Sequence, residues 1–228
     1  MTPQEEALTA RLNSAALELN IDMSVAQGET LLRYLTQLQK WNRTYNLTAL
    51  RDVNKMLVQH LFDSMALVPP LKKYLDTFKA TDGRNRPLLD VGSGGGLPGI
   101  VIAVLFPDRD VHCVDAVEKK MAFVRQMSGS LKLPNLHAHH ARVEALVPFD
   151  AQVVVSRAFA SLQDFAQLAG PHVASDGVLL AMKGHRPDDE IDALHKNTLW
   201  QVQQIEPLHV PELEAQRCLV WMSRKEIK

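Results

Sequence analysis

A glycine-rich stretch between two apolar runs constrains the fold of this chain more than any other feature. The apolar residues Leu88–Val91 come first, four glycines follow between Gly92 and Gly96, and the apolar run Ile100–Phe106 comes next. The first run is continuous rather than alternating, which is typical of a parallel strand buried on both faces. Glycines lack the Cβ atoms that would keep a ligand away from the backbone. The stretch therefore predicts a strand, a tight turn and a helix, with a small ligand at the helix N-terminus.

Two classes of ligand fit this turn. Residues 92–99 contain the G-x-G-x-x-G pattern of dinucleotide-binding folds. Asp90 precedes them and completes D-x-G-x-G-x-G, which resembles the first motif of S-adenosylmethionine (SAM) methyltransferases. Asp115 closes the next apolar run, where an acidic group can bind the ribose hydroxyls that both ligands carry. These residues alone leave both ligands open, together with a tight turn that binds nothing.

The composition indicates one globular domain with an appendage. The chain has 228 residues, of which 46% are hydrophobic, enough for a sizeable core. The N-terminus is polar and shows no secretory signal, and no apolar run approaches the ~20 residues that span a bilayer. Cys113 and Cys218 lie in apolar runs, so we expect small core residues rather than a disulfide or a metal site. We expect a cytoplasmic protein without a membrane partner.

Hydrophobic periodicity predicts a helical N-terminal part and then alternating strands and helices. The first helices are expected at about 8–19, 25–41 and 53–68, with Ser24 as an N-cap and Pro69-Pro70 ending the third. Strands are expected at 88–91, 111–114, 136–139, 151–156, 178–182 (after a turn at 175–177), 200–205 and 218–222. Further helices are expected at 118–131, 162–169 and 187–194, and a loop at 81–85. This order predicts an α/β fold with a mostly parallel, doubly wound sheet.

Ligands of such sheets bind beyond the carboxyl ends of the strands. The residues there are Gly92–Gly96, Asp115, His139–Glu144, Ser156–Phe159 and Lys183–Arg186.

Several of these segments occur in the order of one known family. They are Trp41-Asn42, Tyr45–Thr48, His60 with Asp63-Ser64, Asp90–Gly99, Asp115, Arg142–Glu144, Ser156–Ala160 and Lys183-Gly184. Together they resemble the bacterial 16S ribosomal RNA guanine-N7 methyltransferases, the GidB (glucose-inhibited division protein B) family. The resemblance covers roughly residues 34 to 186, and nothing is carried over from the two ends of the chain. Gly95 departs from relatives that often carry Ala or Pro there, which predicts a looser turn.

The resemblance implies a Rossmann-like, SAM-dependent methyltransferase domain over residues 71–228. Residues 1–70 form an N-terminal helical extension that is expected to pack with it as one compact unit. The implied activity is methyl transfer from SAM to N7 of a specific guanine in 16S ribosomal RNA, within the small ribosomal subunit. No protein partner is predicted, and we expect a monomer.

The expected cofactor-binding residues are Gly92, Gly94, Leu97, Asp115, Val143, Glu144 and Arg157, and no metal site is expected. Asp115 is suited to accept hydrogen bonds from the ribose hydroxyls, but it could instead cap a helix that begins at Glu118. Val143 and Glu144 either contact the adenine edge or form an ordinary helical turn. Arg157 pairs with the cofactor carboxylate, with an RNA phosphate, or in a surface ion pair.

No catalytic residue is assigned, and the candidates for positioning the substrate are His60, Asp63, Arg157 and Lys183. His60 and Asp63 share a helix face, so they either orient a base together or hold the extension on the sheet. Lys183 has the same options as Arg157. Phe159 either stacks on an unpaired base or packs under the following helix.

Other polar residues carry weaker hypotheses. Arg43, Arg51, Arg84 and Arg86 either form a rim that contacts phosphates or lie on a solvated face. Asn42 and Asn46 are expected to be turn residues first. His137, His139 and His140 lack a Cys or carboxylate at ligand spacing, so we expect no metal cluster.

The sequence lacks the motifs of enzymes that methylate other atoms of the bases, which is consistent with guanine N7 as the implied target. Guanine N7 has an in-plane lone pair and no proton to lose, so no general base is needed. Adenine amino methylation usually brings an (Asn/Asp)-Pro-Pro-(Tyr/Phe) motif after the fourth strand, where this chain has Ser156-Arg157-Ala158-Phe159. Cytosine C5 methylation needs a loop cysteine, and neither cysteine lies in a loop.

Two other functions stay open on the residues alone. A dinucleotide-dependent oxidoreductase would use the same sheet and turn. A ribosome-associated RNA-binding factor would keep only a vestigial cofactor pocket. The net charge of −1 argues against indiscriminate binding of nucleic acid but permits a local basic patch.

Overall fold

A helical segment precedes a regular alternation of strands and helices. The computed structural model describes residues 2–77, 85–157 and 159–225. In these residues the α-helices are α1 (Pro3–Glu18), α2 (Val25–Tyr45), α3 (Val53–Met56), α4 (Asp63–Met65), α5 (Val68–Thr77), α6 (Gly99–Leu105), α7 (Glu118–Ser130), α8 (Leu162–Ala169) and α9 (Asp188–Asn197). The strands are β1 (Leu88–Val91), β2 (Val111–Asp115), β3 (Leu136–His140), β4 (Ala151–Ser156), β5 (Val173–Lys183), β6 (Trp200–Pro207) and β7 (Cys218–Arg224). A π-helix, η1 (Leu57–Phe62), joins α3 to α4, and η2 (Val143–Ala145) and η3 (Gly170–His172) are 3-10 helices.

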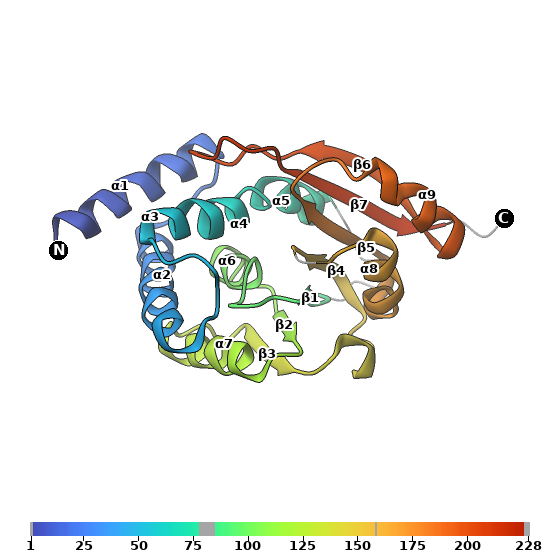
Figure 1. Cartoon of the computed structure of the whole chain (residues 1–228), viewed down its shortest axis with the longest axis horizontal. Coiled ribbons are helices and arrows are strands. Elements are labelled where there is room, and N and C mark those ends of the chain that lie inside the picture. The colour runs from blue at the N-terminus through green and yellow to red at the C-terminus, as the bar shows by residue number, and fades with distance from the viewer. Residues whose placement is uncertain (1, 78–84, 158, 226–228) are drawn as a thin grey trace.

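The strands form one sheet that runs through the middle of the molecule (Figure 1). Its order is β3-β2-β1-β4-β5-β7-β6. Strands β1 to β5 pair in parallel, and β7 lies antiparallel between β5 and β6. The expected α/β fold with a mostly parallel, doubly wound sheet is confirmed. Because the chain leaves β1 for β2 on one side and returns to β4 on the other, the switch point where ligands bind lies at the end of β1.

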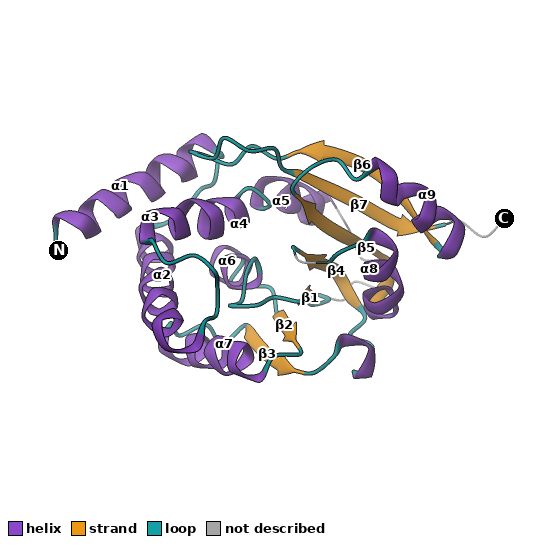
Figure 2. Ribbon diagram, in the orientation of Figure 1, coloured by secondary structure: helices purple, strands orange, loops and turns teal. Residues whose placement is uncertain are grey.

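Successive residues of the central strands enter two different cores. Leu88 and Val111 belong to the core that also contains residues of α2, α6 and α7, whereas Leu89 and Val114 belong to the core that contains residues of α8 and α9. Figure 2 shows helices on both sides of the sheet. This burial on both faces explains why the strand sequences are continuously apolar rather than alternating.

The N-terminal helices share the first of these cores. The predicted N-cap of α2 is confirmed, because the Ser24 hydroxyl accepts the Gln27 N–H and the Gln27 side chain accepts the Ser24 N–H. Tyr34 and Phe62 are fully buried in the same core as Phe123 of α7. The division into residues 1–70 and 71–228 stays a prediction, with α5 lying across its boundary.

The prediction that Pro69-Pro70 ends a helix is wrong. The third helix divides into α3, η1 and α4, and both prolines lie in the first turn of α5, where no backbone N–H is needed within the helix. Leu71 and Leu75 bury one face of α5, a helix that was not predicted from the sequence. The part of the predicted 81–85 loop before Asn85 lies outside the described residues.

The predicted turn at residues 175–177 is also corrected, because β5 begins at Val173. The pairing of β4 with β5 shifts register between Ala151 and Val153, so the extra residues form a bulge inside the strand. A Cβ atom at Gly177 would lie 2.7 Å from the Gln152 carbonyl oxygen, which explains the glycine. The two last predicted strands are confirmed as β6 and β7.

None of the helices in the described residues combines the length and apolar character that crossing a bilayer requires.

Candidate cofactor and substrate site

The turn after β1 needs glycine for two reasons. The backbone φ is 70° at Gly92, 59° at Gly94 and 91° at Gly96. A residue with a side chain would strain the backbone at these values. At Gly99 a Cβ atom would lie 2.4 Å from the Cys113 sulfur, so α6 can pack on β2 only without a side chain there. A Cβ atom at Gly94 would meet no described heavy atom within 4 Å. The turn is therefore closed toward the protein at Gly99 and open to a ligand at Gly94.

Asp90 fixes the start of the helix that follows the turn. Its side chain is buried, and Oδ2 accepts the Gly99 N–H at 2.7 Å. Oδ1 has no hydrogen-bond partner among the described residues. Burial raises the pKa of Asp90 to about 7, although the Gly99 N–H and the Arg157 charge act in the opposite direction. One buried oxygen of Asp90 is thus left beside the turn.

Asp115 ties the end of β2 to the same turn. Its Oδ2 accepts the Gly94 N–H at 3.0 Å, and its Oδ1 accepts the Val117 N–H at 2.8 Å. Lys120 lies 3.5 Å from Oδ2. The alternative that Asp115 caps α7 is wrong, because Val117 holds the N-cap position without a side-chain hydrogen bond. Since each carboxylate oxygen can accept more than one hydrogen bond, Asp115 keeps acceptor capacity for a ligand.

A residue of the N-terminal helices holds the turn from the other side. The Tyr34 hydroxyl donates to the Gly95 carbonyl oxygen at 2.9 Å. Gly95 has no positive φ, and a Cβ atom there would lie 3.2 Å from Leu38 Cδ1. Glycine at position 95, where relatives often carry Ala or Pro, therefore allows close packing against α2 and is not required by the backbone conformation.

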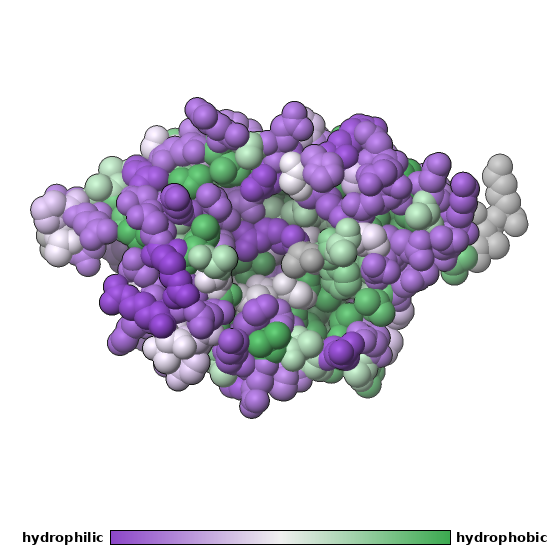
Figure 3. Space-filling view, in the orientation of Figure 1, coloured by the Kyte–Doolittle hydropathy of each residue, from purple (hydrophilic) through white to green (hydrophobic). Residues whose placement is uncertain are grey.

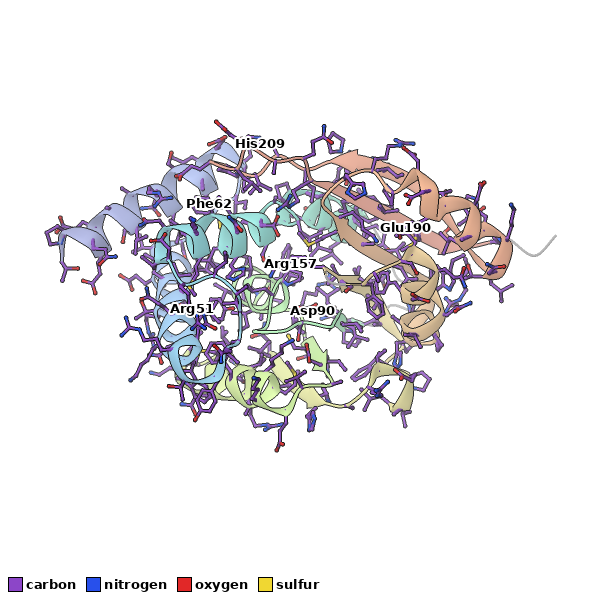
Figure 4. The ribbon with its side chains drawn as sticks, viewed as in Figure 1. Arg51, Phe62, Asp90, Arg157, Glu190 and His209 are labelled. Carbon is purple, nitrogen blue, oxygen red and sulfur yellow. The ribbon has the colours of Figure 1, made fainter. Side chains whose placement is uncertain are left out.

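Arg157 follows β4 and reaches back to the N-terminal helices. Its Nη1 donates to the Gln59 carbonyl at 3.3 Å and to Asp63 Oδ2 at 3.1 Å. The Arg157 side chain is 24% exposed and that of Asp63 is 5% exposed. The ion pair considered for Arg157 exists, but its carboxylate is buried. In Figure 4 Arg157 lies near the middle of the view, between the N-terminal helices and the sheet.

His60 and Asp63 were expected to pair, but in the described residues each forms its hydrogen bonds with other partners. The second oxygen of Asp63 accepts Nε of Arg217 at 2.8 Å, so two arginines enclose this carboxylate. His60 Nε2 instead lies 2.8 Å from the Thr48 hydroxyl. His60 lies in the π-helix η1, a feature that often occurs at functional sites. Asp63 therefore joins the extension to the end of β4 through Arg157 rather than through His60.

The neighbours of His60 determine its protonation. Its Nδ1 lies 3.2 Å from the Gln59 carbonyl, which can only accept, so Nδ1 carries the proton and the Thr48 hydroxyl donates to Nε2. Burial first, and then the Arg157 charge, lowers the pKa of His60 to about 4. His60 is therefore neutral at physiological pH.

Two adjoining cavities meet at Thr48, His60 and Arg157. The turn cavity, of about 180 Å³, is lined by Leu38, Leu47, Thr48, His60, Gly92–Gly95, Leu97, Lys120 and Arg157. The arginine cavity, of about 470 Å³, is lined by Thr48–Leu50, Gln59, His60, Asp63, Arg157, Met182–Gly184 and Arg217. Hydrophilic residues cover most of the visible face of the molecule in Figure 3. The shared wall places anything bound in one cavity beside the other.

The expected cofactor residues are only partly brought together. Gly92, Gly94, Leu97 and Arg157 line the turn cavity, and Asp115 binds the Gly94 backbone. Val143 and Glu144 do not line it. They begin the 3-10 helix η2, where Val143 is buried and its carbonyl lies 2.9 Å from Nε2 of His172, while Glu144 is exposed.

Lys183 lies at the arginine cavity with its charge already paired. Its Nζ is 2.8 and 2.9 Å from the two carboxylate oxygens of Glu190. Glu190 also accepts the Leu162 N–H at 2.6 Å. These contacts join β5, α8 and α9, which favours a structural role for Lys183. Phe159 packs against Phe165 of α8 with ring centres 5.1 Å apart, as the packing alternative predicts.

The other polar candidates divide between structure and surface. Arg86 is buried between Asp150 and Asp176, so it does not belong to a phosphate-contacting rim. Arg51 donates to the Asn42 carbonyl at 2.7 Å and also bonds the Asn46 side chain. Asn46 is a turn residue as predicted, with φ of 49°. The turn prediction is wrong for Asn42, which lies buried in α2, where its side chain binds Thr48 and Leu50. Arg43 is exposed, and Arg84 and Ala158 lie outside the described residues.

The three candidate histidines lie along β3. His112 of β2 bonds His139 at 2.8 Å and stacks on His137 with ring centres 4.6 Å apart. The described part of the chain holds no group of three or more His, Cys, Asp or Glu residues placed to share a metal ion.

Comparison with known proteins identifies the family. A family model described as "rRNA small subunit methyltransferase G" (GidB) matches residues 27–220. The chain belongs to this family. A relative from Bordetella avium named "Ribosomal RNA small subunit methyltransferase G" is 55% identical, over 98% of this chain and 97% of its own length. The relative of the same name from Bordetella pertussis is 58% identical, over 95% of this chain and 93% of its own.

Solved structures of low identity share the fold. A SAM-dependent methyltransferase from Aquifex aeolicus matches with a TM-score of 0.52 and 13% identity, over 70% of this chain and 92% of that chain. The YcgJ protein from Bacillus subtilis matches with a TM-score of 0.53 and 13% identity, over 71% and 99% of the two chains. The expected Rossmann-like methyltransferase fold is confirmed, and neither alternative function finds support in these comparisons.

Two residues of the site were missed by reasoning from the sequence. Tyr34 has the spacing of an ordinary core residue of α2, so nothing in the sequence marks its hydroxyl. Arg217 lies in the last part of the chain, where the resemblance is loose, and 154 positions separate it from Asp63. The available signal was the position of Arg217 directly before the apolar strand that begins at Cys218. An arginine at the end of a sheet where ligands bind is a candidate for ligand binding.

Proposed function

We propose that this chain transfers the methyl group of SAM to N7 of a guanine in 16S ribosomal RNA. The observation that carries the proposal is the family match over residues 27–220, together with relatives named as small-subunit ribosomal RNA methyltransferases at 55% and 58% identity. The turn, Asp115 and Arg157 supply the chemistry that this cofactor requires.

The turn cavity fits part of SAM. Its volume of about 180 Å³ is below the ~300–1,000 Å³ of pockets that enclose a whole small molecule. Gly94 leaves the backbone accessible, and the Arg157 guanidinium suits the carboxylate of the cofactor. The ribose would then lie at Asp115, and the adenine would extend toward Val143 and Glu144.

Bound SAM supplies a methyl group on a positively charged sulfur. Guanine N7 would bond to the methyl carbon with its own lone pair while the methyl–sulfur bond breaks and its electron pair stays on sulfur, so no residue has to remove a proton. The work left to the protein is alignment, which can contribute much of the rate of such a transfer. Thr48, His60 and Arg157 form the wall between the two cavities and are placed to align the base. Because His60 is neutral, it adds no positive charge beside a base that becomes cationic.

The proposed substrate is the assembled small subunit, and the proposed location is therefore the cytoplasm. A chain with a net charge of −1 attracts RNA weakly without specificity, so surface fit has to supplement that attraction. A shaped particle offers more surface to fit than protein-free RNA. Equal or better turnover on protein-free 16S RNA would contradict this part of the proposal.

The proposal is tested by methyl transfer from labelled SAM to small subunits from cells that lack this protein. Nucleoside mass spectrometry of the product is expected to show labelled 7-methylguanosine in the 16S RNA. Thermal stabilisation by SAM, with NAD as the control ligand, tests the cofactor separately. Binding of SAM without label in the RNA would refute the substrate, and stabilisation by NAD alone would refute the cofactor.

A further inference from the structure

We propose that the arginine cavity holds the target nucleotide after its extrusion from the RNA, and that Arg217 binds a phosphate of that nucleotide. This inference rests on the proposed function and adds a substrate-binding residue from the C-terminal hairpin of β6 and β7. Four features support it: the position of the cavity, its charge, the free face of Arg217 and the arrangement of the two arginines.

The position of the cavity suits a substrate rather than a second cofactor. It shares Thr48, His60 and Arg157 with the turn cavity, so a base that reaches this wall lies next to the cofactor. Its volume of about 470 Å³ lies within the ~300–1,000 Å³ of small-molecule pockets. Enzymes that modify a base usually extract it from its stack into such a pocket.

The charge of the cavity suits an anion. Arg157, Lys183 and Arg217 line it, and the carboxylates that pair with them belong to Asp63 and Glu190. Glu190 neutralises Lys183, and Asp63 is shared by the two arginines. Three cations therefore face two carboxylates, which leaves one positive charge for a phosphate.

Arg217 has donors to spare and is held in place. Its Nε donates to Asp63 Oδ1 at 2.8 Å and its Nη1 donates to the Gln216 carbonyl at 2.8 Å. Nη2 has no hydrogen-bond acceptor within the described residues. The side chain is 26% exposed, so the guanidinium reaches the cavity without being solvated on all sides. A fixed guanidinium with free N–H groups is well suited to a phosphate.

The two arginines differ in which cavities they line. Arg157 lines both, whereas Arg217 lines only the arginine cavity. With the base at the shared wall, the sugar and phosphate extend away from the cofactor, toward Arg217. Asp63 positions both guanidinium groups, so it is a positioning residue rather than a catalytic one.

The test compares Arg217→Gln with Arg11→Gln. Glutamine can still donate to Asp63 but carries no charge. Arg11 is a matched control, because it is 29% exposed and its Nε also donates to a carboxylate, that of Glu212, outside both cavities. The measurements are SAM affinity by calorimetry, KM for small subunits, and the salt dependence of subunit binding.

For Arg217→Gln we expect KM to rise about tenfold, the SAM dissociation constant to stay within about twofold, and the slope of log K against log salt to shrink by about 0.7–1, as for one lost phosphate contact. Arg11→Gln is expected to change none of these. An unchanged KM and slope in Arg217→Gln would overturn the inference, and so would a loss of SAM affinity as large as the rise in KM.

Two further results keep the test decisive. If Arg217→Gln melts well below the control, Arg217→Lys replaces it, and a slope equal to that of the unmodified chain is expected because the charge is kept; a reduced slope would overturn the inference. Failure of the proposed function is distinguishable, since the unmodified chain would then put no label into subunit RNA. A chain that methylates normally with Arg217→Gln refutes the inference alone.

Discussion

Removing the Tyr34 hydroxyl tests whether α2 forms part of the cofactor site. Tyr34 is fully buried, and its hydroxyl donates to the Gly95 carbonyl at 2.9 Å. Tyr34→Phe deletes this hydrogen bond and leaves the ring in place against Phe123, whose ring centre lies 6.0 Å away. The turn then loses its tie to α2, while its ties to Asp115 and Asp90 remain.

The structure sets the size of the effect. A neutral hydrogen bond contributes about 1 kcal/mol, and Gly95 is half-buried, so water can partly replace the lost donor. A loss of about 1 kcal/mol lowers the melting temperature of a chain of this size by about 2–4 °C. If the freed turn leaves its binding conformation, SAM affinity falls in proportion to the competent fraction, which limits the loss to about fivefold.

The matched control is Tyr45→Phe. Tyr45 is the last residue of α2, is 44% exposed, and makes the same chemical change at the surface. Calorimetric titration with SAM and thermal melting of the free protein are measured for both variants. A Tyr34→Phe protein that melts lower but binds SAM as the unmodified chain does would refute the role in the cofactor site. Equal effects of the two variants would refute the role of the hydrogen bond.

Four other changes test the remaining parts of the site. Asp115→Ala is expected to weaken SAM binding at least about tenfold, since it removes the acceptor of two backbone N–H groups as well as the proposed ribose contact; wild-type affinity in calorimetry would contradict it. Arg157→Ala is expected to lower methyl transfer at saturating RNA by about tenfold or more, and unchanged turnover would remove its assigned role. Gly94→Ala is expected to cost about 1–2 kcal/mol of stability from its positive φ and to weaken SAM binding further, whereas the helical control Gly129→Ala should stabilise the fold by up to about 1 kcal/mol. The pKa of Asp90 is raised to about 7 in the fold, so its contribution to stability is complete below about pH 4 and is lost as the pH rises to about 7. Asp90→Asn should therefore gain stability relative to the unmodified chain between about pH 4 and 7, by up to about 1.4 kcal/mol per pH unit, and should gain no more above that range. Parallel pH profiles in urea unfolding would refute this.

The parts of the fold that the sequence predicts well are those that local patterns specify. The bounds of β4 (Ala151–Ser156) and α8 (Leu162–Ala169) match the prediction residue for residue. β4 is a mostly apolar run that ends at Ser156, and α8 has apolar residues at helical spacing after the N-cap Ser161, so local patterns alone define both. The turn after β1 was predicted from local sequence as well, because four glycines between two apolar runs indicate a tight turn.

The errors lie where a neighbouring element decides the structure. Pro69-Pro70 indicates a helix end from the sequence alone, and only the burial of Leu71 and Leu75 against the core makes it a helix start. The bulge at residues 175–177 depends on the register of β4. In both cases tertiary packing overrides a correct local preference.

The site itself could be predicted only in part, because its ion pairs join distant segments. His60 and Asp63 share a helix face, which indicates a pair. The Asp63 carboxylate instead accepts hydrogen bonds from Arg157 and Arg217, which lie 94 and 154 positions away. Helical spacing specifies which residues share a face and says nothing about which partners approach that face. The charge of His60 also depends on distant segments, because burial and the nearby Arg157 charge lower its pKa.

These contacts make the two ends of the chain part of one site. Tyr34 of α2 holds the turn, Asp63 of α4 holds Arg157, and Arg217 of the C-terminal hairpin closes the arginine cavity. Under the proposed function, the Rossmann-like sheet contributes the turn, Asp115 and Arg157 to cofactor binding, whereas Arg157, Met182 and Lys183 form only part of the arginine cavity. We therefore expect specificity for a nucleotide to reside in the segments that precede β1 and follow β5.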